Sequence, residues 1–238
     1  TVNAFSHTEG HDNNDYITTS YSTYTLKGGT FGGDMRLVKQ GEGILNLSGE
    51  QTYSGPTDLW GGIVNFTGKL PNSRVWMNRF AELNAKADFG KDIKMEYASV
   101  LRIGGTGETA IIHADSVTMR YGAVMEFDLY SENTQADRIV LAKGLLLETL
   151  NRSDGPEFQA PIFRFTPHYQ NGKSVMAAGR YLIAEVKKID GNVDDILLQG
   201  LETQKCHLEY ENGQIFLVIK ETRDAAQVYW DGTHTLNE

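Results

Sequence analysis

Hydrophobic and polar residues alternate over short runs along the first half of this chain, and the runs repeat. Three stretches align almost residue for residue, at residues 75–85, 93–103 and 117–127. Alternation with a period of two predicts β-strands that have one buried and one exposed face. A unit of this size cannot bury its hydrophobic face alone, so the repetition predicts a solenoid in which each copy is one coil stacked on the next.

The repeat extends upstream, where Asn46, Asn65 and Asn84 stand 19 residues apart, and Arg102 and Glu126 take the same position in later copies. The alternation predicts two inward columns, which are Leu45, Val64, Leu83, Leu101 and Met125; and Leu47, Phe66, Ala85, Ile103 and Phe127. Met77, Met95 and Met119 stand in register in the aligned stretches, and we expect them to stack in successive parallel layers. The asparagine column lies between two inward columns, so we expect it to face solvent. The alternative is that the asparagines point inward at a turn and satisfy backbone groups.

A second outward column is hydrophobic. It consists of Ile44, Ile63, Val100 and Val124. A row of exposed aliphatic residues of this length usually indicates that something covers it. We expect the cover to be the N-terminal 30 residues or the C-terminal part of the same chain.

The pattern changes near residue 130, after which short hydrophobic runs are separated by polar breaks. Residues 211–214 have Asn-Gly at their centre, the strongest short signal for a β-hairpin. A terminal hairpin of this kind would cover the open edge of the last coil. We therefore expect an all-β chain divided into a covering segment at 1–34, coils at 35–130, an antiparallel cap continuous with them at 136–222, and an exit linker at 223–238.

Composition narrows the choice of partners. The chain has 238 residues, a hydrophobic fraction of 40% and a net charge of −9, with no basic run, so nucleic acid is not an expected partner. No stretch is long and hydrophobic enough for a transmembrane helix, and the first residues are no signal peptide. The single Cys206 cannot form an intramolecular disulfide.

One segment resembles the autotransporter-associated β-strand repeat. The matching features are Lys39, Gly41 and Gly43 as Lys-x-Gly-x-Gly, followed by Ser48-Gly49, Tyr53-Ser54-Gly55, Thr57 and Gly61-Gly62. The segment departs from the repeat at Glu50 and Gln51. Residues 136–141 resemble the Ser-Asp-x-Leu-x-Val segment that follows the coils in similar passengers, and residues 228–232 resemble the Trp-Asp-Gly that closes them.

This resemblance implies a right-handed parallel β-helix in a secreted or surface-displayed bacterial protein. The membrane barrel that gives autotransporters their name is missing from the chain, so a true autotransporter is not implied. The chain starts in the middle of the pattern, and we expect it to be a fragment of a longer parent polypeptide that carries other domains.

Candidate catalytic chemistry is sparse. Residues 7–15 combine His7, His11, Asp12 and Asp15, which could bind a metal ion, although a solvated loop explains them as well. Asp194 and Asp195, or Asp12 with Asp15, could serve as the paired carboxylates of a glycosidase or as the calcium ligands of a pectate lyase. Cys206 and His207 are neighbours in a strand, where side chains point to opposite faces. We expect no catalytic residues, no cofactor and no metal, and the Gly28–Gly33 run fits turns.

Four aromatic residues are the candidate ligand-binding residues, Trp60, Trp76, Tyr97 and Tyr121. They fall at outward or turn positions of successive coils, and flat aromatic faces with polar neighbours suit sugar rings. The alternative is that they seal the core at the corners of the coils.

Three functions remain open. The first is a non-catalytic β-helical structural or display module that supports adhesion or spacing, with an extracellular glycan or host surface as partner. The second is a glycan-binding accessory module, and the third is a β-helical polysaccharide lyase or glycoside hydrolase.

Overall fold

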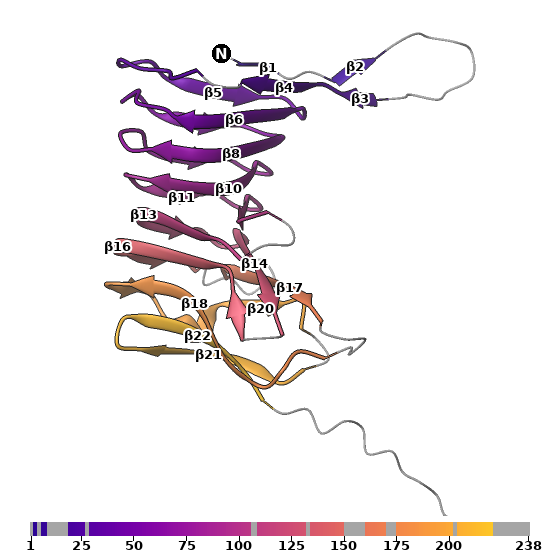
Figure 1. Cartoon of the computed structure of the whole chain (residues 1–238), viewed down its shortest axis with the longest axis vertical. Helices are drawn as coiled ribbons and strands as arrows, with labels where there is room; N and C mark the ends of the chain where they lie inside the picture. The colour runs from indigo at the N-terminus through magenta and orange to yellow at the C-terminus, as the bar shows by residue number, and fades with distance from the viewer. Residues whose placement is uncertain are drawn as a thin grey trace, which may run out of the picture.

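The computed structural model of the chain describes residues 2–3, 6–8, 19–26, 29–105, 109–131, 134–149, 160–169, 175–201 and 204–220. Its strands stack in successive layers along one long axis, and a C-terminal hairpin closes the far end (Figure 1). Twenty of the described strands form one continuous sheet. The strands β2 (Ser6–Thr8) and β3 (Thr19–Tyr21) form a separate antiparallel pair.

Each coil contributes one strand to each of two rows. The first row is β1 (Val2–Asn3), β5 (Leu37–Gln40), β7 (Thr57–Leu59), β9 (Val75–Met77), β11 (Ile93–Met95), β13 (Ile111–Met119), β16 (Arg138–Leu147) and β19 (Ile189–Asp190). The second row is β4 (Thr23–Leu26), β6 (Ile44–Glu50), β8 (Ile63–Leu70), β10 (Glu82–Phe89), β12 (Val100–Ile103), β14 (Val124–Tyr130), β17 (Ile162–His168) and β20 (Leu197–Gln199).

Every neighbouring pair within both rows is parallel. A third, shorter parallel row joins the ends of β8 and β10 to the starts of β13 and β16 and then to residues 184–186. The predicted β-helical solenoid is therefore confirmed.

The register of the coils is the one that the sequence repeat predicts. Met95 pairs with Met77 on one side and with Met119 on the other, and all three side chains are fully buried. The two further inward columns are also buried, with no member more than 5% exposed. Like residues therefore stack on like residues along the axis, and each buried side chain covers the one in the next coil.

The asparagine column lies on the outer side of the second row, where its members are half-buried. Asn65 Nδ2 donates to Asn46 Oδ1 at 2.7 Å, and Asn84 Nδ2 donates to Asn65 Oδ1 at 2.8 Å. The asparagines thus pair with one another across coils rather than facing bulk water alone, and only the buried Oδ1 of Asn84, at the end of this described ladder, has no hydrogen-bond partner. This mutual pairing explains why polar side chains are tolerated between two buried columns.

The same column continues as charged residues in the later coils. Arg102 lies 3.2 Å from Glu126, and Glu126 lies 3.7 Å from Arg164. Arg164 Nε in turn donates to Gln199 at 3.3 Å. The alternating charges neutralise the buried Glu126 and extend the polar ladder to the last parallel strand.

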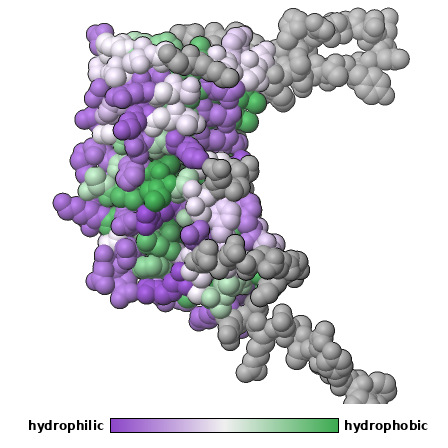
Figure 2. Space-filling view, in the orientation of Figure 1, coloured by the Kyte–Doolittle hydropathy of each residue, from purple (hydrophilic) through white to green (hydrophobic). Residues whose placement is uncertain are grey.

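The outward aliphatic column is only partly exposed. Ile44, Ile63 and Val100 are half-buried, and Val124 is buried. Its cover by the N-terminal or C-terminal part of the chain stays a prediction. On the face shown in Figure 2, hydrophobic surface gathers over the middle and lower coils, around β13 and β16, and the surrounding surface is mostly hydrophilic.

The C-terminal end of the stack is antiparallel. The strand β18 (Gly179–Val186) pairs in parallel with β16 and in antiparallel with β22 (Gln214–Ile219), which pairs with β21 (Cys206–Glu211). Asn212 and Gly213 join the last two strands with φ of 51° and 79°. The predicted hairpin is confirmed, and its turn needs Asn-Gly because both central residues have positive φ.

Parallel pairing in the second row continues through β17 and β20, alongside the antiparallel cap. The division into segments 1–34, 35–130, 136–222 and 223–238 stays a prediction, and the exit linker at 223–238 lies outside the described residues.

Asp137 is a fully buried carboxylate between coils. Its Oδ1 accepts a hydrogen bond from Ala110 N at 2.7 Å, and its Oδ2 accepts one from Asp128 N at 2.9 Å. Burial raises the pKa of Asp137 to about 7, against the opposite effect of these two hydrogen bonds. The residue ties β14 to the segment before β13, in the part of the chain that resembles the Ser-Asp-x-Leu-x-Val segment.

The inward columns should tolerate a charge far less than the asparagine ladder does. We expect Leu101→Asp to lower the free energy of unfolding by at least about 4 kcal/mol, because it places an unpaired carboxylate in the stack. Asn65→Asp should cost less than about 1 kcal/mol, since it remains half-exposed and the amide of Asn46 can flip to donate to it. Urea denaturation compares the two variants, and equal losses would contradict the assignment of the faces.

Ionisation of Asp137 should make the protein less stable as the pH rises. The pKa of Asp137 in the folded state lies above the ordinary value of about 3.9. Its contribution to the free energy of unfolding is therefore fully present below about pH 3.9 and is lost as the pH rises through about 7. Between about pH 4.5 and 8, the unfolding free energy of the wild type should fall by roughly 3 kcal/mol more than that of Asp137→Asn. Urea denaturation across this range measures the difference, and the exposed Asp190→Asn should follow the wild type. Parallel profiles for wild type and Asp137→Asn would contradict this role.

Candidate functional site

The two rows of strands meet at a corner that recurs in each coil. It is formed by residues 41–43, 60–62, 78–81, 96–99 and 120–123, between the end of a first-row strand and the start of the next second-row strand. The last three are four-residue β-turns, closed by backbone hydrogen bonds of 2.9–3.1 Å. The strand register places Phe80, Ala98 and Gly122 at the same position of these turns.

All three residues at this position have positive φ, which is 62° at Phe80, 56° at Ala98 and 69° at Gly122. A β-turn with positive φ at its third residue favours glycine, because a Cβ is crowded there. A bulky side chain in this region is a genuine outlier that costs roughly 1–2 kcal/mol. Phe80 adopts this unfavourable conformation although it is 72% exposed, so burial of its side chain does not offset the energetic cost.

Lys39 secures the earliest described corner from inside. Its side chain is fully buried at an inward position opposite Leu59. Its ammonium donates to the carbonyl oxygens of Gln40, Gly41 and Gly61 at 2.8–3.0 Å. Burial lowers the pKa of Lys39 below its ordinary value. The lysine of the Lys-x-Gly-x-Gly pattern therefore joins two successive corners by binding their backbone carbonyls.

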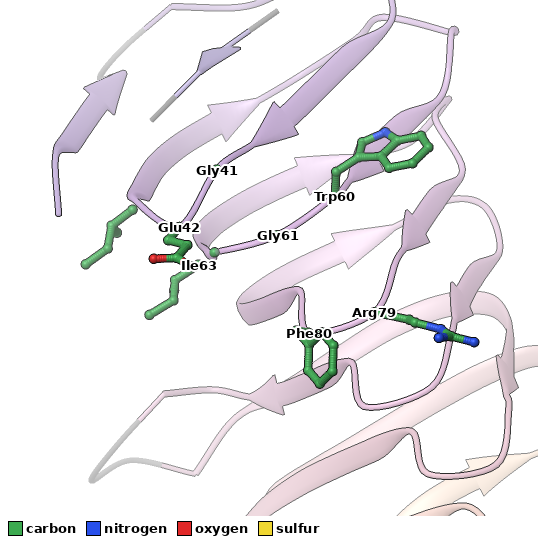
Figure 3. A pocket seen from close by; sticks show the side chains of 9 residues that line it. Gly41, Glu42, Trp60, Gly61, Ile63, Arg79 and Phe80 are labelled. Atoms are coloured by element: carbon green, nitrogen blue, oxygen red, sulfur yellow. The ribbon is translucent and has the colours of Figure 1, made fainter. Parts of the chain in front are cut away.

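The next corner carries only one side chain, that of Trp60. Gly61 occupies the position where the neighbouring corners carry Glu42 and Arg79-Phe80, and the resulting corner hollow has a volume of about 550 Å³. At Gly62 a Cβ would lie 2.5 Å from two backbone oxygens and 2.7 Å from Lys39 Nζ, so only glycine fits. Figure 3 shows Trp60 on one side of the hollow, Glu42 and Ile63 on the other, and Phe80 from the next corner.

An aromatic series runs along the corners beyond the hollow. The ring centroids of Phe80 and Tyr97 are 6.5 Å apart, and those of Tyr97 and Tyr121 are 5.7 Å apart. The guanidinium of Arg79 lies 5.7 Å from the Tyr97 ring. The ring of Tyr97 also lies against Gly122, where a Cβ would come within 2.6 Å of it. The two tyrosines are half-buried and therefore cover the corner as well as presenting aromatic edges.

The structure brings three of the four predicted ligand-binding residues to the corners. Trp60, with its side chain 52% exposed, lines the corner hollow, and Tyr97 and Tyr121 continue the aromatic series from Phe80. Trp76 lies instead on the outer face of β9, where its Nε1 donates to Glu96 at 3.2 Å. Lys94 Nζ lies 5.1 Å above the Trp76 ring. Binding by these four residues stays a proposal.

Sequence reasoning missed Phe80 and the inward position of Lys39. Phe80 could have been found from the alignment of the corners, because an aromatic residue stands there where two other corners have Ala98 and Gly122. The sign of its φ could not be read from its residue type. Lys39 could have been found because it falls in the inward column that contains Leu59 and Met77.

The other candidate sites gain no support. In the part of the chain that the structure describes, no group of three or more His, Cys, Asp or Glu residues is placed to hold a metal ion. The predicted ligands at positions 7–15 lie outside the residues whose side chains are described. Asp194 and Asp195 are exposed in a single 3-10 turn, η2 (Val193–Asp195). Glu42 is the one carboxylate among the described residues that line the corner hollow.

Residues 37–66 match the family model of the passenger-associated-transport-repeat. This match confirms the resemblance to the autotransporter-associated repeat, and it spans both Lys39 and the Gly61-Gly62 floor of the hollow. No curated protein matches the chain.

The chain is thus a β-helical module that carries a passenger-associated-transport-repeat at residues 37–66, and this repeat implies a secreted or surface-exposed protein. Within the described residues, the structure contains no helix with the length and hydrophobicity needed to span a membrane.

The hydrogen bonds of the Lys39 ammonium to the corner carbonyls should contribute to the free energy of unfolding. We expect Lys39→Met to lower the free energy of unfolding by roughly 2–4 kcal/mol, because it leaves three corner carbonyls without their donor. Lys69→Met, at an exposed position of β8, should change it by less than about 0.5 kcal/mol. Chemical denaturation measures both. A Lys39→Met variant as stable as the wild type would show that other donors can replace the ammonium.

Proposed function

We propose that the chain is a non-catalytic structural and display module of an exported bacterial surface polypeptide, in which it provides spacing and a platform for adhesion. The observation that carries this proposal is the unbroken parallel pairing of both rows together with the passenger repeat at residues 37–66. Seven steps of about 4.8 Å along a row give a rigid rise of roughly 34 Å. The longer parent polypeptide and its other domains belong to this proposal.

The architecture suits a module that must remain folded outside the cell. Each coil is held by backbone hydrogen bonds to both neighbours, and its buried side chains cover those of the next coil. The antiparallel pair β21 and β22 occupies the edge that the C-terminal end of the stack would otherwise expose.

A register-preserving deletion tests the display function. Removing residues 64–82 joins Ile63 to Leu83, which occupies the position of Val64 in the next coil. We expect the shortened chain to unfold cooperatively and to shorten by about 4.8 Å, because the remaining strands pair in the same register.

The readout in cells is surface exposure. An epitope tag at the N-terminal end of the chain should remain accessible to external protease in both the full-length and the shortened parent polypeptide. A tag that is protected inside the cell in the full-length protein would contradict the display function. Small-angle X-ray scattering of the purified chains measures the change in length.

Glycan binding is the second candidate function, and the corner aromatics favour it. Trp60, Phe80, Tyr97 and Tyr121 all lie along one edge of the solenoid, whereas Trp76 lies apart from them on the outer face of β9. Aromatic rings in a row suit successive sugar units of an extracellular or host-surface glycan. A glycan array probed with the purified chain tests this candidate. Absence of binding to every glycan leaves display as the function.

A further inference from the structure

The exposed aromatic side chain of Phe80 is held in place at an energetic cost. Its turn position has positive φ, the equivalent positions carry Ala98 and Gly122, and the side chain is 72% exposed. Backbone strain that brings no burial is typical of functional sites, because it persists only where the surrounding structure enforces it. Glycine at this position would relieve the strain, so the aromatic ring itself is the feature to be explained.

The ring of Phe80 borders a hollow of ligand size. A volume of about 550 Å³ lies within the range of small-molecule sites. The floor is the backbone of Gly61 and Gly62, with Trp60 and Phe80 at its edges (Figure 3). Small-molecule sites are usually lined by hydrophobic side chains with a few polar groups.

The polar groups at the rim are of both signs. Glu42 supplies carboxylate acceptors and Arg79 supplies guanidinium donors. Figure 3 shows them on different sides of the hollow, so each can bind a separate hydroxyl group, which both donates and accepts hydrogen bonds. The net charge of −9 is unfavourable for association with an anionic ligand, so we take a neutral sugar rather than a uronic acid as the ligand class.

We propose that the corner hollow binds a neutral pyranose unit of an oligosaccharide, with its apolar face against Phe80 and Trp60 and its hydroxyl groups on Glu42 and Arg79. The neighbouring unit of the same glycan extends toward Tyr97 along the aromatic series. This proposal rests on the glycan-binding candidate above and specifies its site and its ligand class.

Three variants separate binding from folding. Phe80→Gly removes the ring and also relieves the positive-φ strain, so its melting temperature should equal or exceed that of the wild type while binding weakens at least tenfold. Trp60→Ala should weaken binding to a similar extent. Gly61→Leu should fill the hollow, because a Cβ at Gly61 meets its nearest atom at an ordinary 3.7 Å and the backbone there does not have positive φ.

Two matched controls accompany them. Ala98→Gly makes the same backbone change at the same turn position without removing an aromatic ring. Trp76→Ala removes an exposed tryptophan outside the hollow. Both controls should bind as the wild type does.

The probe is an array of neutral hexopyranosyl oligosaccharides and uronate-containing oligosaccharides, followed by isothermal titration of the purified chain with the strongest neutral hit. Binding of neutral oligosaccharides that is lost in Phe80→Gly, Trp60→Ala and Gly61→Leu, and kept in both controls, supports the proposal. Binding that persists in those three variants, or that is lost in Trp76→Ala instead, overturns the assignment of the binding site to the corner hollow. The glycan-binding candidate function would still stand. Binding only to uronates overturns the ligand class, and no binding at all overturns both proposals while display stands.

Discussion

The fold depends on the in-register stacking of parallel strands, in which each buried side chain is covered by its equivalent one coil away. A single coil has two edges of unpaired backbone groups and a hydrophobic face that it cannot bury alone. Stacking solves both problems at once. The translation from one coil to the next pairs the backbone N–H and C=O groups of neighbouring strands, and it also covers the buried side chains. The column of Met77, Met95 and Met119 shows this relation in its simplest form.

This constraint also determines where polar and strained residues can stand. The asparagine ladder is tolerated because translation by one coil brings each amide to the next at hydrogen-bonding distance. Lys39 is tolerated in an inward column because the corner carbonyls of two coils converge on its ammonium. At the corners themselves the backbone is fixed by the strands on both sides, so a residue such as Phe80 can be held with positive φ. Function can therefore be added at corners without altering the core.

Much of the fold could be predicted from the sequence because it follows from alternation and repetition. The inward columns could be read from the hydrophobic positions, the register from the aligned repeats, and the terminal hairpin from Asn212-Gly213. The candidate site could be predicted only in part. The corner hollow arises because Gly61 has no side chain where the neighbouring corners carry Glu42 and Arg79-Phe80. In the sequence alone, the Gly61-Gly62 pair is explained equally well by a tight turn. Asp137 likewise needs the fold, since its partners come from residues 110 and 128.

The central claim is that equivalent residues of successive coils lie in direct contact along one axis. Nuclear Overhauser effects between the labelled ε-methyl groups of methionine test it most directly, with each signal assigned by a single Met→Leu substitution. The stack predicts cross-peaks between Met77 and Met95 and between Met95 and Met119, and none between Met77 and Met119, which are two coils apart. Absence of the first two cross-peaks, or a strong cross-peak between Met77 and Met119, would contradict it.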